Sequence, residues 1–189
     1  MEEYRIWIIA GVSATIVIWA IVKYNKFVKL RNNRENAFAD IDVQLKQRHD
    51  LIPQLVATVK GYAAHEKDTL ERVVNARNGA MNAQTIDEKI VAEGALNTAL
   101  AGLKVTVERY PDLKANTNFM HLQEEISDIE NKLAAVRRYF NSATKEFNTA
   151  IGMFPANIIA GMFSFRKEMM FDLGTTERQS LQQAPTISF

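Results

Sequence analysis

Residues 119–154 read FMHLQEEISDIENKLAAVRRYFNSATKEFNTAIGMF and hold the most regular pattern in this chain. Apolar residues recur at alternating spacings of three and four, which is typical of a helix that packs along another helix. One set of positions carries aromatic or large aliphatic residues, and the other shrinks to alanine toward the end. Large residues opposite small ones interdigitate well, so this stretch predicts a long helix in an antiparallel bundle. The series is Phe119, Leu122, Ile126, Ile129, Leu133, Val136, Phe140, Ala143, Phe147, Ala150 and Phe154.

The same rhythm predicts a first long helix from Tyr24 to about Arg77 and a second from Ile86 to Tyr110, where Pro111 is expected to stop it. Pro53 lies inside the first pattern, whose phase is the same on both sides of it, so we expect a kink at Pro53 and not an end. We therefore predict an all-α fold with three long helices and a shorter C-terminal one. The apolar seam of the first helix is Phe38, Ile41, Leu45, Ile52, Leu55, Val59 and Tyr62, with Arg48 filling its one gap.

Residues 6–22 contain no charged side chain. As a helix they span about 25 Å, and extending the count from Tyr4 to Tyr24 reaches the thickness of a bilayer core, about 30 Å. The acidic start, the absence of a small-residue cleavage site and the basic residues that follow argue against a cleaved signal peptide. With no cysteine in the chain, a lipid-modified cysteine is excluded as well. The segment therefore predicts a retained transmembrane helix that continues into the bundle.

The charge bias predicts the orientation of this anchor. Five Lys or Arg residues follow the apolar segment within about a dozen residues, against Arg5 alone before it, so the C-terminal side is expected to be cytoplasmic. We predict an extracytoplasmic N-terminus at 1–5, a transmembrane helix at 6–22, a cytoplasmic bundle at 23–174 and a flexible tail at 175–189. The basic residues are Lys23, Lys26, Lys29, Arg31 and Arg34.

Three strings carry a resemblance to a known family. They are NAFADIDVQL at 36–45, RHDLIPQLV at 48–56 and KGYAAHE at 60–66, and further matches occur at Ala76-Arg77 and in FPANIIAG at 154–161. Together they resemble the LemA family over most of the chain. The resemblance implies a single-pass bacterial inner-membrane protein with a helical, cytoplasm-facing body, and it implies no established enzyme activity or cofactor.

A buried role is expected for Arg48, because it replaces an apolar residue in the seam. We predict that it pairs with a carboxylate of its own or a neighbouring chain, with Asp40 and Asp42 as candidates, and that such a pair fixes the register between helices. A metal site is not expected, since His49 and His65 lie over four helical turns apart and Thr69 stands where a zinc-protease motif needs its second histidine. The residues expected to serve packing and assembly are Phe38, Ile41, Leu45, Arg48, Asp50 and Pro53.

Two C-terminal features are candidate interaction surfaces. The stretch from Met153 to Phe171 is crowded with apolar residues, which either cap the bundle or form an exposed patch for a partner or a bilayer. In a bundle of three long helices it lies far from the anchor. Ile187 and Phe189 end the tail beside the free carboxylate, a pattern that suits strand addition to a partner. The residues predicted for the first surface are Ile158, Ile159, Met162, Phe163 and Phe165.

Several function classes lack support. A net charge of +1 gives no footprint for nucleic acid, and there is no Gly-rich phosphate loop, G-x-S-x-G motif or cysteine nucleophile. We therefore expect no enzyme activity, cofactor, metal or small-molecule substrate. The favoured function is a membrane-anchored scaffold that self-associates into a homo-oligomer. The alternatives are an adaptor whose tail recruits a membrane protease or transporter, and a membrane-remodelling protein.

Overall fold

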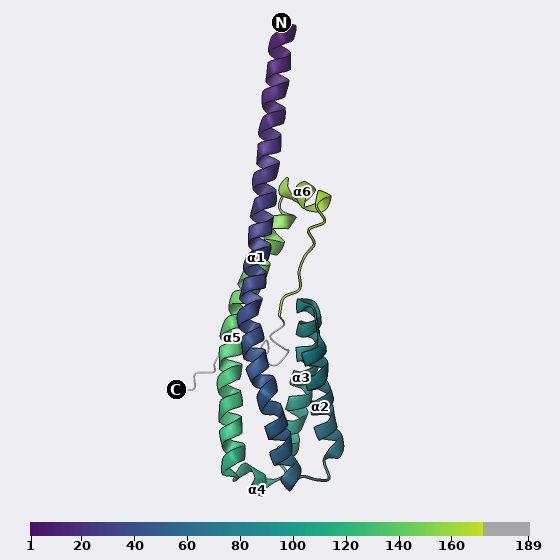
Figure 1. Ribbon diagram of the computed structural model, residues 1–189, viewed down its shortest axis with the longest axis vertical. Helices are drawn as coiled ribbons and strands as arrows, with labels where there is room; N and C mark the ends of the chain where they lie inside the picture. The colour runs from purple at the N-terminus through teal and green to yellow at the C-terminus, as the bar shows by residue number, and fades with distance from the viewer. Residues whose placement is uncertain (172–189) are drawn as a thin grey trace, which may run out of the picture. The chain divides into compact units, whose positions relative to one another are not determined.

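The computed structural model describes residues 1–171 and contains six α-helices, with no β-strand in that part of the chain. The predicted all-α helical bundle is therefore confirmed (Figure 1). The chain divides into two compact units: unit 1 combines residues 1–40 with 136–170, and unit 2 is built on residues 41–135. The helices are α1 (Glu2–Tyr62), α2 (Lys67–Asn82), α3 (Ile86–Val107), α4 (Pro111–Lys114), α5 (Thr117–Gly152) and α6 (Ala156–Met162).

The first helix ends earlier than the sequence pattern predicts. Pro53 stays inside α1 as an exposed residue, and the helix ends at Tyr62. The chain turns within residues 63–66, where the amide of Glu66 donates to the carbonyl of Ala63 at 3.0 Å. Leu70, expected further along the first helix, belongs to α2 and packs in the same core cluster as α1. Apolar spacing alone does not separate one long helix from two that fold back on each other, because both bury the same residues.

This extra turn changes where the C-terminal part of the bundle lies. The body has four long helices, α1, α2, α3 and α5, where the pattern predicts three. An even number of passes returns the chain to the end at which it started. The expectation that the segment after Met153 lies far from the anchor is therefore wrong, because Ile151 and Ile159 share a core cluster with Phe27 of α1.

Unit 2 is a helical bundle around one apolar core. Helices α2 and α3 form an antiparallel hairpin, and α3 begins with a capping box: the Glu88 amide donates to Thr85 Oγ1 at 3.2 Å, and the Thr85 amide donates to Glu88 Oε2 at 3.0 Å. Pro111 does not end α3, which stops at Val107, but opens the short α4. The buried core residues are Ile52, Leu55, Val59, Ala63, Leu70, Val73, Ala80, Leu96, Leu103, Val107, Leu113 and Phe119.

Unit 1 has a separate core, rich in aromatic rings. Phe38 and Phe140 meet edge to face with ring centroids 5.5 Å apart, which ties α1 to α5. Phe165, which follows α6, packs against Phe27 at 5.5 Å and Phe147 at 6.3 Å. Helices α1, α5 and α6 pack together in this core. Its buried cluster is Phe27, Leu30, Phe147, Ile151, Ala156, Ile159 and Ala160.

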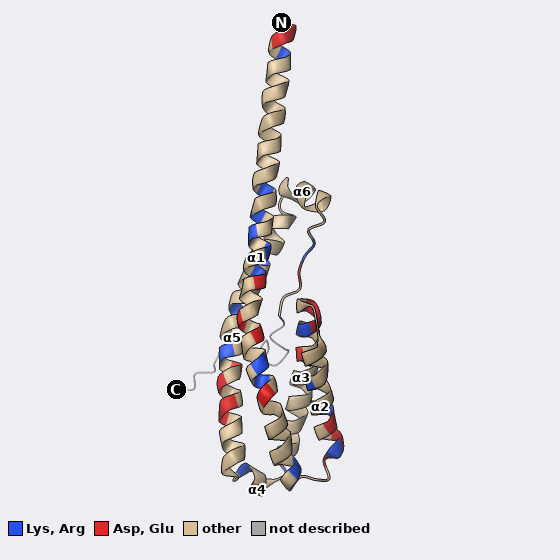
Figure 2. Ribbon diagram, viewed as in Figure 1, with Lys and Arg blue, Asp and Glu red and all other residues tan. Residues whose placement is uncertain are grey.

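The start of α1 is the strongest candidate for a membrane span. Its best window has a mean hydropathy of 2.1 with none of it buried, and every residue from Met1 to Ile18 is exposed. Figure 2 shows this stretch free of charged residues between the first turn and Lys23. Helix α3 also has a mean hydropathy that a span would have, 1.3, but a third of its window is buried and it holds the buried, ion-paired Glu93. We therefore assign α3 to the packed body of unit 2.

Candidate functional site

A buried polar network crosses the core of unit 2. The side chain of Arg48 on α1 is fully buried, and its guanidinium donates to Glu93 Oε2 on α3 at 2.7 Å and to Glu130 Oε1 on α5 at 2.6 Å. It also donates to Asn97 Oδ1 on α3 at 2.9 Å. One side chain thereby joins three helices. Charge-assisted hydrogen bonds of this length are among the stronger ones in proteins.

His49 extends the network on the side of α2. Its Nε2 lies 2.6 Å from Glu93 Oε1, so both oxygens of this buried carboxylate have a partner. Arg77 Nε on α2 donates to the backbone carbonyl of His49 at 2.7 Å. Four helices therefore contribute to one network, and its hydrogen bonds have fixed directions. A core of apolar residues alone would not specify the rotation of each helix as narrowly.

The prediction that Arg48 is buried with a carboxylate agrees with this geometry, but the predicted partners are wrong. Asp42 pairs with Lys89 of α3 at 2.7 Å, and Asp40 is exposed. Both lie too far from Arg48 along α1: Asp42 is six residues before it and Asp40 eight, which correspond to about 9 Å and about 12 Å of helix. The sequence does carry a signal for Glu93: it interrupts the apolar spacing of α3 between Ile90 and Leu96, as Arg48 interrupts that of α1. Two opposite charges that fill gaps in two seams predict a pair.

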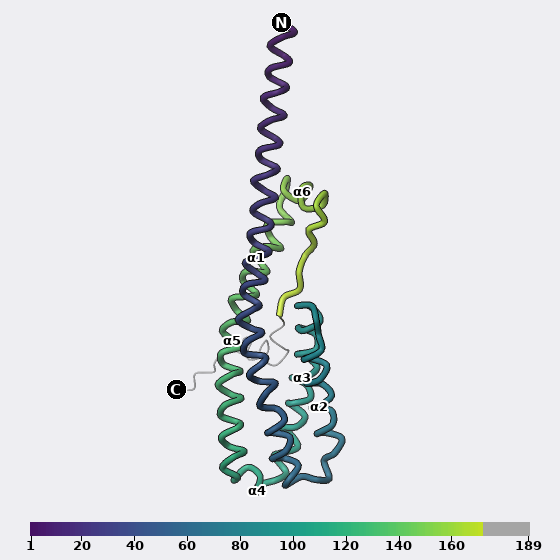
Figure 3. Tube along the Cα trace, in the orientation of Figure 1, coloured from purple at the N-terminus to yellow at the C-terminus, as the bar shows by residue number. Residues whose placement is uncertain are grey.

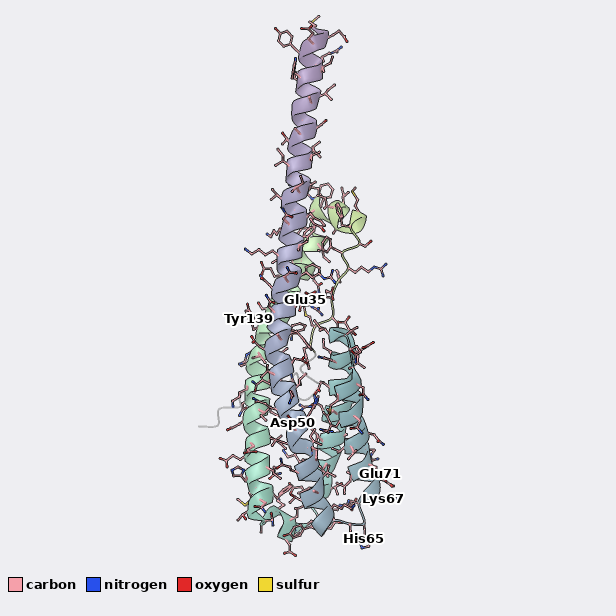
Figure 4. The ribbon with its side chains drawn as sticks, in the orientation of Figure 1. Glu35, Asp50, His65, Lys67, Glu71 and Tyr139 are labelled. Carbon is pink, nitrogen blue, oxygen red and sulfur yellow. The ribbon has the colours of Figure 1, made fainter. Side chains whose placement is uncertain are left out.

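The remaining residues predicted for packing and assembly divide into two groups. Phe38, Ile41 and Leu45 are buried in this chain. Pro53 and Asp50 are exposed, and Asp50 accepts from Lys46 one turn earlier at 3.0 Å (Figure 4). The buried part of the seam is therefore occupied by the chain's own helices.

The predicted apolar surface around α6 is only partly exposed. Ile159 is buried in the core of unit 1, and Phe165 is half-buried against Phe27. Ile158, Met162 and Phe163 are exposed. The segment therefore caps the end of unit 1 with one side and leaves the other side uncovered. The tail residues Ile187 and Phe189 lie outside the described residues, so the adaptor hypothesis stays a prediction.

A groove of about 590 Å³ opens on unit 2 beside the polar network. It is lined by residues of α3 and α5, together with Leu55 of α1 and Lys114 of α4, and Glu130 links it to Arg48. At its rim Lys114 pairs with Glu108 at 2.6 Å, and this cation holds the pKa of the Glu108 carboxyl below its usual value. The lining residues are Leu55, Leu100, Ala101, Leu103, Lys104, Val107, Glu108, Lys114, Phe119, Gln123, Ile126, Ser127 and Glu130.

A second polar cluster closes the turn between α1 and α2. Glu66 Oε1 accepts from Arg109 at 2.8 Å and from the hydroxyl of Tyr110 at 3.1 Å. Burial raises the pKa of Tyr110, and the neighbouring carboxylate of Glu66 raises it further. His65, which the sequence pairs with Glu66, is exposed at this turn (Figure 4). Across residues 1–171, no group of three His, Cys, Asp or Glu side chains is placed to hold a metal ion.

These features define a class of protein: an all-α bundle whose first helix carries a bare apolar segment, with a four-helix polar network in the core. Residues 37–189 match the LemA family, and the chain belongs to it. Among curated relatives, protein LemA of Metamycoplasma hominis is 26% identical, covering 82% of this chain and 71% of its own length. Magnetosome protein MamQ of Magnetospirillum gryphiswaldense is 23% identical and covers 80% of this chain, which spans 65% of MamQ. Magnetosome protein MamQ 2 of Paramagnetospirillum magneticum is 22% identical over the same shares.

Proposed function

We propose that this protein is a membrane-anchored scaffold without catalytic activity, which presents a rigid helical body at the cytoplasmic face of a bacterial inner membrane and self-associates there. The observation that carries the proposal is the continuity of α1. The exposed apolar segment ends near Val22, and Phe27 and Leu30 on the same helix are already buried in the body. No linker separates anchor from body, so the body cannot swing freely. Rigid presentation is what a scaffold needs.

The self-association that we propose needs a surface other than the apolar seam of α1. The seam residues Ile41, Leu45 and Arg48, which the sequence suggested for assembly, are already buried within one chain. A second copy therefore needs an outer surface. The outer face of α3 fits this requirement, because it is exposed over four turns and carries no charged side chain. Its residues are Val91, Gly94, Ala95, Thr98, Ala101, Gly102 and Val105.

Small residues on this face allow close approach of a second helix. A side chain built at Gly94 or Gly102 would meet no other atom within 4 Å, so both glycines open onto free surface. Within residues 91–105 the charged residues are Glu93, which is buried, and Lys104, which lies about 120° around the helix from Thr98 at the centre of the face. The chain is 24% charged, yet the outer face of α3 is uncharged along residues 91–105. Such a face favours contact with another uncharged helix face. The occupant we propose is α3 of a second copy.

The test is the mass of the full-length protein in lipid nanodiscs or mild detergent. The wild-type protein is expected to form a discrete oligomer. Gly94→Glu adds a charge to the α3 face and leaves the fold intact, since its side chain meets open space, so it should give a monomer. Gly79→Glu is the matched control: it adds the same charge at an equally open glycine on α2, beside the polar Asn75 and Asn78.

A wild-type monomer would contradict the self-associating scaffold. An oligomer that Gly94→Glu leaves unchanged would contradict the role of α3. An oligomer that both glycine variants disrupt equally would show a general effect of added charge and would likewise contradict the α3 contact.

A further inference from the structure

Helix α6 lies against the last turns of the apolar segment of α1 (Figure 3). The core cluster that contains Ala156, Ile159 and Ala160 of α6 packs against Trp19 and Ala20. Further along α1, the ring of Tyr24 lies 4.8 Å from that of Phe163 and 5.7 Å from that of Phe165. The end of the candidate span and the end of the bundle therefore form one packed structure.

The side of this structure that faces away from the core is also apolar. No charged residue occurs between Gly152 and Ser164, and the exposed polar side chain in this stretch is that of Asn157. Phe154 is 83% exposed and Met162 is 75% exposed, which is unusual for such large apolar side chains. We call this the α6 surface: Met153, Phe154, Ile158, Met162 and Phe163.

Hydrogen bonds of the backbone after α6 hold the α6 surface in place. After α6 the amide of Phe165 donates to the carbonyl of Ala160 at 2.9 Å, the hydrogen bond that closes a Schellman cap. Asn148 of α5 then receives and donates one bond each with the backbone of Glu168, at 2.8 and 2.9 Å. These bonds fix the chain that follows α6, so its outer residues cannot simply fold inward.

The depth of α6 follows from the length of the span. A helix that crosses a bilayer core needs about 20 residues, which places its second boundary near Lys23 if the first lies near Glu3. Trp19 and Ala20 lie inside that boundary by about one turn. Side chains that pack on them are therefore at the level where the helix leaves the hydrocarbon. Trp19 and Tyr24 are also the residue types enriched at this level.

We propose that the α6 surface lies in the interfacial layer of the same bilayer that α1 crosses, with its apolar side chains among the upper acyl chains. This inference rests on the proposed membrane anchoring of α1. Charge supports the lipid as occupant: Lys23 and Lys26 follow the apolar segment on α1, Arg166 and Lys167 follow Phe165 after α6, and such residues suit anionic headgroups. The surface is continuous with the span through the Tyr24–Phe163 ring contact. A short apolar helix beside basic residues is the composition of an interfacial helix.

A protein that contacts the bilayer through both the span of α1 and the α6 surface is more restricted than one that contacts it through the span alone. A single helix can tilt and rotate in a bilayer, whereas a helix with a second contact beside it has a preferred rotation. The α6 surface thereby fixes the rotation of α1 about its own axis, because the side of α1 that carries α6 has to leave room for α6 in the interfacial layer. Anchoring and orientation are then separate functions of two segments that are about 130 residues apart in sequence and adjacent in space.

The experiment uses spin labels on the full-length protein in liposomes that contain anionic lipid. The chain has no cysteine, so each introduced cysteine is the single labelling site. Labels are placed at Met162→Cys and Ile158→Cys on the α6 surface. Collision with oxygen, which concentrates in lipid, is compared with collision with a water-soluble nickel complex. The expected result at both positions is an oxygen collision rate several-fold above that of nickel.

Two further labels make the outcomes distinguishable. Val17→Cys, on the exposed face of the apolar segment, reports on anchoring alone and should reach oxygen. Tyr139→Cys is the matched control in the body: it is 62% exposed on α5 (Figure 4), about 20 Å of helix before Gly152, and should reach nickel. A Val17 label in water would show that the anchoring proposal itself has failed.

With Val17 in lipid, two results at Met162 and Ile158 would overturn the inference. If both labels reach nickel as readily as the Tyr139 label, the α6 surface faces water. If both are immobile and reached by neither reagent, the surface is covered by protein, such as a second copy. A preference for oxygen at both positions supports contact with lipid.

Discussion

Arg34 and Arg48 lie fourteen positions apart on α1, and both are buried on its packed face, yet they hold different parts of the molecule. Arg48 is fully buried in unit 2 and joins helix to helix through Glu93 and Glu130. Arg34 in unit 1 pairs with Glu168 at 3.3 Å and donates to the carbonyl of Met169 at 3.2 Å. Its guanidinium also lies 5.0 Å from the centre of the Phe140 ring.

The difference shows that the structural importance of a buried arginine depends on how deeply its paired carboxylate is buried. Glu93 is 1% exposed, whereas Glu168 keeps 24% of its side chain in contact with solvent. Breaking the first pair leaves a buried carboxylate that keeps the His49 ring as a partner but has lost its guanidinium, and breaking the second leaves a carboxylate that water can reach. Arg48 therefore acts on the whole of unit 2, and Arg34 acts on the segment that holds α6 in place.

The largest effect is expected for Arg48→Leu. Because Glu93 is left buried without its cation, the free energy of unfolding should fall by about 3–5 kcal/mol. The measurement is chemical unfolding in detergent, followed by circular dichroism.

The double variant Arg48→Leu with Glu93→Leu is the control for that result. With both charges gone, most of the lost stability should return, because apolar replacements of buried ion pairs are often close to neutral. Glu130 remains acceptable, since its side chain is 39% exposed. If the double variant is as unstable as the single one, the loss comes from packing and not from an unpaired Glu93.

A smaller and more local effect is expected for Arg34→Leu. Its hydrogen bond and ion pair are replaced by an apolar contact, at a cost of about 1–2 kcal/mol. Amide hydrogen exchange should rise in residues 164–170, while exchange in α2 and α3 stays at the wild-type level. Equal increases in both regions would mean that Arg34 stabilises the entire chain, as Arg48 does.

Thr85→Ala removes the side-chain acceptor from the capping box of α3. The expected loss is about 1 kcal/mol, since the Glu88 amide then lacks its partner. Thr98→Ala on the same helix is the matched control, because that hydroxyl bonds only back to the carbonyl of Gly94 in the helix interior and should cost little. Similar losses in the two variants would argue against a specific capping contribution.

The smallest effect concerns pH. Backbone amides of Thr85 and Gln84 hold the pKa of Glu88 below its ordinary value of 4.5. A carboxyl with a lowered folded-state pKa stabilises the protein above its unfolded pKa, and this contribution is lost as the pH falls through the folded value. Glu88→Gln should therefore melt below the wild-type protein at pH 7, and the difference should shrink toward pH 3. A difference in melting temperature that is constant with pH would contradict this assignment.

Much of the fold follows from spacing in the sequence. The three-and-four rhythm of residues 119–154 predicts α5 to within two residues at each end, and the rhythm from Ile86 predicts α3. The turn at residues 63–66 is the element that spacing misses. Nothing in the apolar pattern marks it, because Val59 and Leu70 pack in one core whether or not the chain reverses between them.

The candidate site was predictable in part. Arg48 is identified by its place in the seam, and Glu93 by the same argument applied to α3. The partners of Arg34 have no such signal, since Glu168 and Met169 lie in an extended segment whose position depends on Asn148. The position of α6 beside the anchor follows from the number of helical passes, so missing the turn at 63–66 also misplaced this surface.

The unbroken course of α1 places a constraint of helical phase on the sequence near the membrane. Each residue turns a helix by about 100°, so one residue inserted between Val22 and Phe27 would rotate the span by that angle relative to α6. Trp19 and Ala20 would then leave the cluster that they support. Seven inserted residues would nearly restore the angle but add about 10 Å of length. The number of residues between span and body is therefore constrained as tightly as the identity of those residues.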